Sequence, residues 1–209
     1  MATLQCFRPM PYFSFDFCKE FQIQPGSILS GNIQYTFNAP QPHTEDAVFN
    51  NPNYLRSATS EEFKEILDRT LSDSISSGFG VTFMAGQKHI PFGTTANCSI
   101  ITVRIDKNEI NIHEDMYNPG RIKVSFCDST GFKFGYLSIT DRGFYDYAIN
   151  HRQNGTVDKI NRFLLSQDEI ILRVGVGRRY ESQGKDGYWL QVNGIYTFPN
   201  YSKVIRSYG

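Results

Sequence analysis

The stretch from Glu169 to Phe198 has the sequence EIILRVGVGRRYESQGKDGYWLQVNGIYTF. Two runs rich in β-branched and aromatic residues flank a polar, glycine-containing segment, Glu181–Gly187. This pattern predicts a β-hairpin with a loop longer than two residues. The first run carries arginines and the second carries Tyr188 and the only tryptophan, Trp189. Such a strand pair suits a flat anionic partner, and it equally suits an ordinary half-exposed sheet.

Strand alternation divides the hairpin into two faces. Leu172, Val174 and Val176 share one face and are expected in the core. We therefore expect the opposite face to point outward, with Arg173, Arg179, Trp189 and Gln191 together on it.

The hairpin supplies the candidate nucleic-acid-binding residues, which are Arg173, Arg178, Arg179, Tyr180, Lys185, Tyr188 and Trp189. In this interpretation arginines follow phosphates, and aromatic rings stack on bases for about 1–3 kcal/mol per base. The alternative places Trp189 and Tyr180 in the core. The arginines would then be solvated charges that discourage pairing at a sheet edge.

The 209 residues fit one large domain or two small ones of about 100 residues each. With 17 Phe and 12 Tyr, and with turn residues between short apolar runs, the chain is expected to be mainly β. Strands are expected at 28–37, 76–83, 99–105, 109–113, 121–127 and 132–139, besides the hairpin. A loop is expected at 38–53.

Two helices are expected. One begins near Thr59, because Thr59 and Glu62 have capping-box spacing and apolar residues follow at helical intervals. It should cover one end of a β core. The other spans Val157–Leu165, with Thr156 as its N-cap.

About nine short strands with two inserted helices fit two small barrels or one sandwich. Five-stranded OB barrels with a helix between strands match these lengths. We expect two OB-like small barrels with one or two short helices, the first over residues 1–90 and the second over residues 98–209. The natural boundary is the segment 84–97.

The net charge is zero, with 21 basic and 21 acidic residues, so the whole-chain charge does not indicate a nucleic-acid binder. Residues 170–209 hold six basic and two acidic residues, which leaves room for a local basic patch. The four cysteines form no C-x-x-C pair, so a structural zinc site is not expected. The chain also lacks a G-x-S-x-G, H-E-x-x-H, P-loop or Cys/His arrangement, and we expect no metal and no cofactor. No apolar run approaches about 18 residues and no leader pattern opens the chain, so we expect a cytoplasmic protein without a membrane partner.

Four segments, in order, resemble the dual OB-containing domain family of prokaryotic proteins. They are Pro40–Asp46 (PQPHTED), Leu71–Ile75 followed by Gly78–Gly80, Ile122–Asp141, which ends in a T-D pair, and Leu172–Arg178 followed by Trp189–Tyr196. Residues 1–10 lack the family's Cys- and Gly-bearing opening strand, and position 47 is Ala where the family has an aromatic residue. Whether the first barrel is complete is left open.

The resemblance implies two OB-like barrels and recognition of nucleic acid or nucleotide in a conflict or phage-defence setting. Fold analogy gives no chemistry by itself, because OB folds also bind oligosaccharides and proteins.

His43, Glu45 and Asp46 form the most enzyme-like cluster, a polar loop site that could bind a metal or act as acid and base. Three such residues within four positions of a loop do not converge on one ion without a distant partner. A loop held by hydrogen bonds is the simpler interpretation. Neither the glycines of Val174–Arg178 nor Gly78–Phe83 has the context of a phosphate loop or an RNA-recognition strand.

Three functions follow from these observations. The first is a non-catalytic binding module for single-stranded nucleic acid or a nucleotide, with the hairpin as contact surface. The second is a protein-interaction adaptor that docks a partner in a defence complex. The third, least favoured, is a hydrolase that uses Glu45, Asp46 and a distant histidine.

Overall fold

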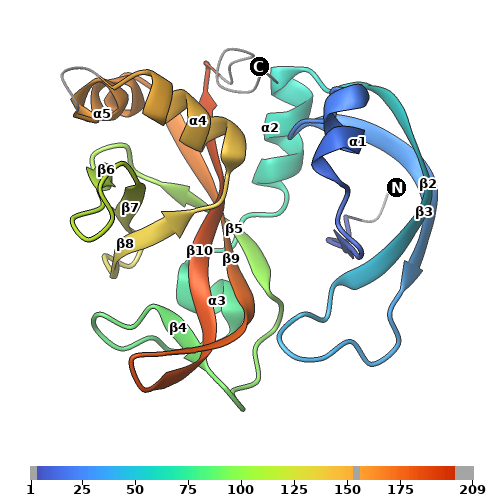
Figure 1. The fold of residues 1–209 in the computed structure, drawn as a ribbon, viewed down its shortest axis with the longest axis horizontal. Helices are drawn as coiled ribbons and strands as arrows, with labels where there is room; N and C mark the ends of the chain where they lie inside the picture. Colours follow the sequence, from blue (N-terminus) through green and yellow to red (C-terminus); the bar gives the residue numbers. More distant parts are fainter. Residues whose placement is uncertain (1–3, 153–155, 201–209) are drawn as a thin grey trace.

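The computed structural model describes residues 4–152 and 156–200 (Figure 1). The outer ends of the two expected domains, at residues 1 and 209, lie outside this part of the chain. Strands account for 41% of the described residues and helices for 19%, which confirms the prediction of a mainly β protein. The strands form a three-stranded sheet and a seven-stranded sheet.

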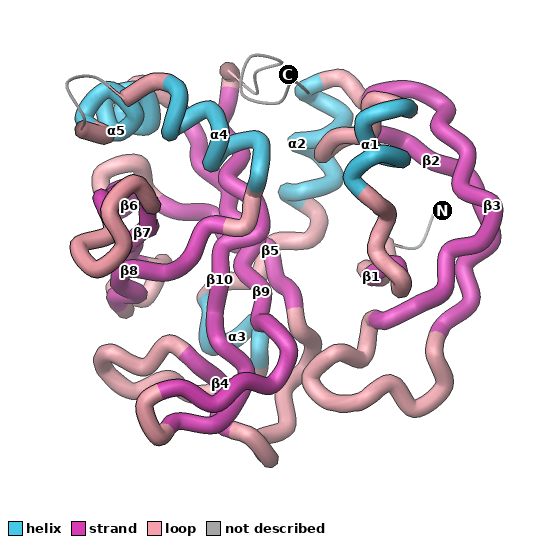
Figure 2. Tube along the Cα trace, viewed as in Figure 1, coloured by secondary structure: helices cyan, strands magenta, loops and turns pink. Residues whose placement is uncertain are grey.

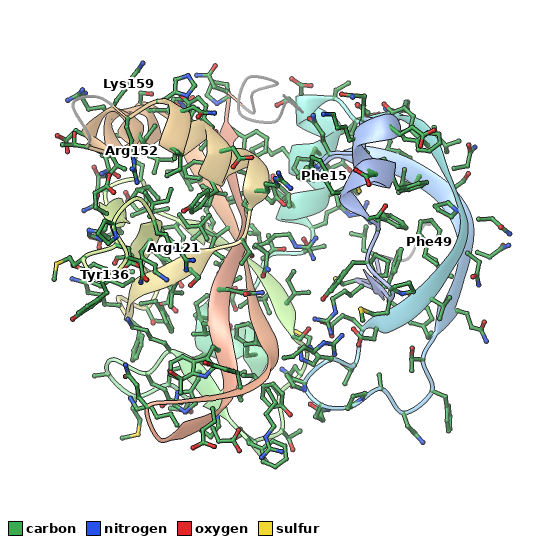
Figure 3. All side chains as sticks on the ribbon, in the orientation of Figure 1. Phe15, Phe49, Arg121, Tyr136, Arg152 and Lys159 are labelled. Atoms are coloured by element: carbon green, nitrogen blue, oxygen red, sulfur yellow. The ribbon has the colours of Figure 1, made fainter. Side chains whose placement is uncertain are left out.

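The smaller sheet is built by the N-terminal residues and lies at the right of Figure 1. Its strands are β1 (Arg8–Pro9), β2 (Ser27–Tyr35) and β3 (Asp46–Ser57), in the order β1-β3-β2. Helix α1 (Phe15–Glu20) lies between β1 and β2 in the sequence. Phe49 of β3, labelled in Figure 3, contacts the rings of Phe7 and Phe13, so aromatic packing joins the sheet to the segment that precedes α1.

The larger sheet is organised around the predicted hairpin, β9 (Glu169–Ser182) and β10 (Lys185–Phe198), which runs through the middle of the molecule (Figure 2). The sheet order is β5-β9-β10-β8-β7-β6. Strand β4 (His89–Pro91) also pairs with β10. The other strands are β5 (Ile100–Ile105), β6 (Ile110–Glu114), β7 (Ile122–Cys127) and β8 (Lys133–Ile139), which confirms four predicted strands.

The main core lies on the face of β9 and β10 that alternation predicts. Leu172, Val174 and Val176 are buried there with Leu190 and Val192. Helices α3 (Ile75–Phe79), α4 (Arg142–Asn150) and α5 (Asp158–Leu165) contribute buried side chains to the same core.

Helix α2 (Ser60–Asp68) covers the opposite face of the hairpin at one end, between the two sheets in Figure 1. Its Leu67 packs against Ile171, Tyr196 and Phe198. The predicted capping box of Thr59 and Glu62 is present. The helix and its place at one end of the β core are confirmed.

Neither sheet closes into a barrel, so the two OB-like barrels are not confirmed. The edge strands of the larger sheet are β5 and β6, which follow one another in the sequence. They are separated by a tight turn in which the amide of Glu109 donates to the carbonyl of Asp106. The division at residue 90 stays a prediction, although Ile75, Phe79 and Ile90 pack in the core of the larger sheet.

Three local predictions were wrong. Residues 75–79 form α3 rather than a strand, because Ser74 and Ser77 make a capping box and Gly80 ends the helix with a φ of 67°. The expected loop 38–53 ends early, since β3 begins at Asp46. Helix α5 has Val157, not Thr156, at its N-cap.

Candidate nucleic-acid interface

The hairpin turn is tighter than expected. Strand β9 extends to Ser182 and β10 starts at Lys185, which leaves a two-residue turn of Gln183 and Gly184. Both residues have positive φ, 52° and 71°, as a type I′ hairpin requires. The expected loop of more than two residues was wrong, because the polar residues around Lys185 continue the ladder.

Two β-bulges reset the alternation of the hairpin. Tyr188 pairs with Arg179 and Leu190 pairs with Val176, so Gly177 and Arg178 together oppose Trp189 alone. An extra residue in one strand turns the following side chains to the other face. The prediction that Arg173 and Arg179 share a face was therefore wrong, and Arg178 takes the expected place of Arg179 beside Arg173.

Arg179 is engaged within the protein. Its guanidinium makes a bidentate contact with Asp186, with Nη2 to Oδ2 at 2.6 Å, and lies 3.5 Å from the ring centroid of Phe92. Arg178 instead donates to Asp46 at 2.9 Å. Two of the three candidate arginines are thus bound to carboxylates.

Trp189 and His89 form a stacked pair at the surface. Their ring centroids are 5.1 Å apart at an interplanar angle of 27°. The pair is aligned by the pairing of β4 with β10, in which His89 lies opposite Trp189, and by a hydrogen bond from Trp189 Nε1 to the carbonyl of Tyr180. Tyr188 lies in the core at 8% exposure, so it is not part of this surface.

A second ring pair lies on neighbouring strands. His113 of β6 and Tyr136 of β8 have ring centroids 4.7 Å apart. Lys88 Nζ lies 5.7 Å from the centroid of the half-exposed Tyr136 ring, so a lysine beside β4 joins the two ring pairs.

We name this surface the basic–aromatic face, and its members are Lys88, His89, His113, Lys123, Lys133, Tyr136, Lys185 and Trp189. In the described part of the chain, Lys88, Lys133 and Lys185 form no ion pair. Burial, followed by the positive charges of Lys123 and Lys185, lowers the pKa of Lys88. Burial and neighbouring lysines also lower the pKa of both His89 and His113. The face is crowded with positive charge.

The polar loop site does not converge on one ion. The Glu45 carboxylate accepts from the backbone N–H and the hydroxyl of Ser99, whereas the Asp46 carboxylate accepts from Arg8 and Arg178. No group of three or more metal-ligating side chains occurs in residues 4–152 and 156–200.

Asp46 and His43 have shifted pKa values. Burial by itself would raise the pKa of Asp46, but hydrogen bonds from Arg8 and Arg178 outweigh it and hold the pKa below its usual value. The His43 ring is 2% exposed and packs edge-on against Tyr188. Burial, followed by the charges of Arg8 and Arg178, lowers the pKa of His43 to about 4. Through Arg178 of β9 and Tyr188 of β10, Asp46 and His43 connect the smaller sheet to the larger one.

Sequence reasoning missed six members of the face, which are Lys88, His89, His113, Lys123, Lys133 and Tyr136. Lys88 and His89 lie in the segment taken as a domain boundary, and only the pairing of β4 with β10 brings them to Trp189. The basic-aromatic composition of Lys88-His89 was the one local signal available.

Comparison with protein-family models, curated proteins and solved structures found no match for this chain. No helix among the described residues is long and apolar enough to span a bilayer.

Proposed function

We propose that the protein is a non-catalytic module that binds single-stranded nucleic acid through the basic–aromatic face. The observation that carries this proposal is the presence of two ring pairs, Trp189–His89 and Tyr136–His113, on one surface with lysines between and around them. Aromatic rings at a surface stack on bases with little sequence preference, and the surrounding lysines contact the phosphate backbone. Of the hairpin residues expected to bind, this face retains Trp189 and Lys185.

The strand order of the larger sheet supports an OB-like ancestry, which we include in the proposal. Strands β6, β7 and β8 form an antiparallel meander, β8 pairs in parallel with β10, and β10 pairs antiparallel with β9. In this interpretation β5 and β6 are two halves of one strand that is interrupted at Asp106–Glu109. OB folds bind oligonucleotides on the face of their second and third strands, and here β7 and β8 supply Lys123 and Tyr136. A phage-defence setting rests on the family resemblance alone.

The direct test is fluorescence anisotropy with labelled single-stranded DNA, single-stranded RNA and the matching duplexes. We expect single strands to bind more tightly than duplexes, since stacked platforms need unpaired bases. The logarithm of the affinity should fall with the logarithm of salt with a slope of about −2 to −3, as expected for three or four phosphate contacts on a single strand.

The charge of the face is tested by Lys88→Gln, with Lys159→Gln as its matched control. Lys159 is an exposed lysine of α5, away from Tyr136 (Figure 3). Lys88→Gln should weaken binding and make the salt slope shallower by about 0.7, whereas Lys159→Gln should change neither. Equal effects of the two variants, or no binding to any of the four probes, would contradict the proposal.

A protein-interaction adaptor is the second candidate. Large apolar side chains are exposed on both long strands of the smaller sheet, including Ile33, Tyr35 and Leu55, of which Leu55 is 54% exposed. Exposed apolar groups of this kind on a sheet favour contact with another protein. Absence of nucleic-acid binding together with specific, salt-insensitive capture of a partner would favour this function.

A further inference from the structure

A cleft of about 560 Å³ separates β1 of the smaller sheet from β9 and β10 of the larger one. Arg8 enters it from β1, and Arg173 and Arg178 enter it from β9. Gln191 and Asn193 of β10 complete the polar part of the lining. Trp189 does not line the cleft.

The charges around the cleft do not balance. Within the described residues, Asp46 is the one carboxylate that bonds to any of the three arginines. It accepts from Arg8 Nε at 2.6 Å and from Arg178 Nη2 at 2.9 Å. Arg173 has no carboxylate partner there, and its Nη2 lies 3.3 Å from the Cys6 sulfur, a weak acceptor. Glu45 is bonded to Ser99 and lines a separate, smaller cavity. Three guanidinium groups against Asp46, with the Glu45 carboxylate held behind the cleft-lining Ser99, leave an excess of positive charge around the cleft.

Three buried polar atoms of residues that line the cleft have no hydrogen-bond partner in the part of the chain that the structure describes. They are Nη2 of Arg8, which does contact the Asp46 carboxylate as an ion pair, Nε of Arg173 and Oδ1 of Asn193. Asn193 is the extra residue of the second bulge, between the Val192–Val174 and Gly194–Arg173 pairs. Its amide lies across Gly175, where a Cβ would collide with Oδ1. An unpaired buried polar group is costly, so a ligand that draws these side chains into hydrogen bonds removes that cost.

The remaining wall of the cleft is aromatic. Phe7, Tyr12 and Tyr196 line it, and Tyr12 is 60% exposed. The volume falls in the range of about 300–1,000 Å³ that is usual for small-molecule sites. A ring and a charged group therefore fit on opposite sides of one cleft.

We propose that this cleft binds the phosphate monoester of a ligand of mononucleotide size. The phosphate contacts Arg173 and Arg178, and the base or another flat ring packs on Phe7 and Tyr12. A phosphate monoester carries a charge of about −1.5 to −2 at pH 7, which suits the excess of positive charge around the cleft, and arginine forks suit its geometry. The ligand is either a free nucleotide or the phosphorylated end of a nucleic-acid strand.

Calorimetric titrations of the full chain with AMP, adenosine and inorganic phosphate test the site. We expect saturable binding of AMP, and binding of adenosine that is at least about tenfold weaker, since loss of a charge-assisted hydrogen bond costs about 1.5–3 kcal/mol. Arg173→Gln should weaken AMP binding by about tenfold or more, and Arg173→Lys should have a smaller effect. The matched control is Arg121→Gln, an exposed arginine outside the cleft lining, which should leave AMP binding unchanged.

Oligonucleotides with and without a 5′-phosphate distinguish the two sources of the phosphate. Tighter binding of the phosphorylated strand that depends on Arg173 assigns the site to a strand end, and saturable AMP binding assigns it to free nucleotide. Emission of Trp189, the only tryptophan, should change with an oligonucleotide and not with AMP, so failure of this site and failure of the basic–aromatic face are separable. Equal affinity for adenosine and AMP, insensitivity to Arg173→Gln, or no phosphate-dependent binding of any probe would overturn the proposal.

Discussion

At the residue scale, Trp189 shows how one side chain acquires a functional environment from its neighbours. Its ring stacks on His89, and its indole N–H is satisfied by the carbonyl of Tyr180. A ring fixed in this way offers a base an ordered surface at low entropic cost.

Replacing Trp189 by Ala should weaken single-stranded nucleic-acid binding by about 1–3 kcal/mol, roughly five- to 150-fold in Kd, because one stacking surface is lost. Anisotropy titrations with the labelled oligonucleotides measure the change. Trp189→Phe is the control that keeps an aromatic face, and it should retain most of the affinity. An unchanged Kd for Trp189→Ala would remove this residue from the interface.

His43 makes the stability depend on pH. Its folded-state pKa of about 4 lies below its ordinary value of 6.5, so the unfolded chain binds more protons between these values. Stability is therefore complete above about pH 6.5 and falls as the pH drops toward 4. From the two pKa values, the loss at this site is about 2 kcal/mol between pH 7.5 and pH 5.

Urea denaturation at pH 7.5 and pH 5 measures this dependence. His43→Phe keeps an aromatic ring in the buried position and should flatten the pH profile. Some dependence should remain, because the pKa values of His89 and His113 are lowered in the same direction. A profile of unchanged steepness in the variant would exclude His43 as the main titrating group.

At the element scale, the pairing of β4 with β10 decides whether the basic–aromatic face exists. Gly187 pairs with Pro91 in this ladder, and a Cβ at Gly187 would collide with the backbone carbonyl of Ile90. Backbone has little room to move away, in contrast to a flexible side chain.

Gly187→Ala should displace β4, destabilise the protein by about 1–3 kcal/mol and weaken nucleic-acid binding, since His89 would leave Trp189. Gly177→Ala is the matched control, because its Cβ would lie at an ordinary 3.8 Å from the carbonyl of Trp189. The control should be neutral or slightly stabilising, by about 0.5–1 kcal/mol. Urea denaturation and anisotropy measure both variants, and identical behaviour of the two would contradict this account of β4.

At the scale of the whole molecule, the two sheets are joined by charged and polar contacts near the cleft. Asp46 of the smaller sheet binds Arg178 of the larger sheet, and its side chain is only 10% exposed. Glu45 binds Ser99 in the same region. The arrangement of the sheets therefore depends on a few partly buried ion pairs and hydrogen bonds.

Asp46→Asn should destabilise the protein by about 1–3 kcal/mol, mainly because it leaves Arg8, whose side chain is 15% exposed, without its carboxylate, whereas the half-exposed Arg178 stays hydrated. Asp146→Asn removes an exposed partner of Arg142, whose ion pair has 59–66% exposed side chains, and should cost less than about 1 kcal/mol. Chemical denaturation measures the difference. Similar small losses in both variants would show that the inter-sheet ion pairs are well solvated.

The sequence by itself determined the elements that depend on neighbouring residues. Alternation over Leu172–Val176 identified the core face of the hairpin, and the spacing of Thr59 and Glu62 placed α2. Local hydrogen bonds and the burial of one strand face set these features, and both are visible in a short window.

Only the tertiary structure decided which side chains of the hairpin share a face and which residues they contact. The bulge at Gly177–Arg178 separates Arg173 from Arg179, and its position depends on pairing between residues that alternation cannot align. The partners of Trp189 and Arg178 are His89 and Asp46, which lie 100 and 132 positions away in the chain. Contacts over such separations arise from the packing of the two sheets, so no local pattern in the sequence specifies them.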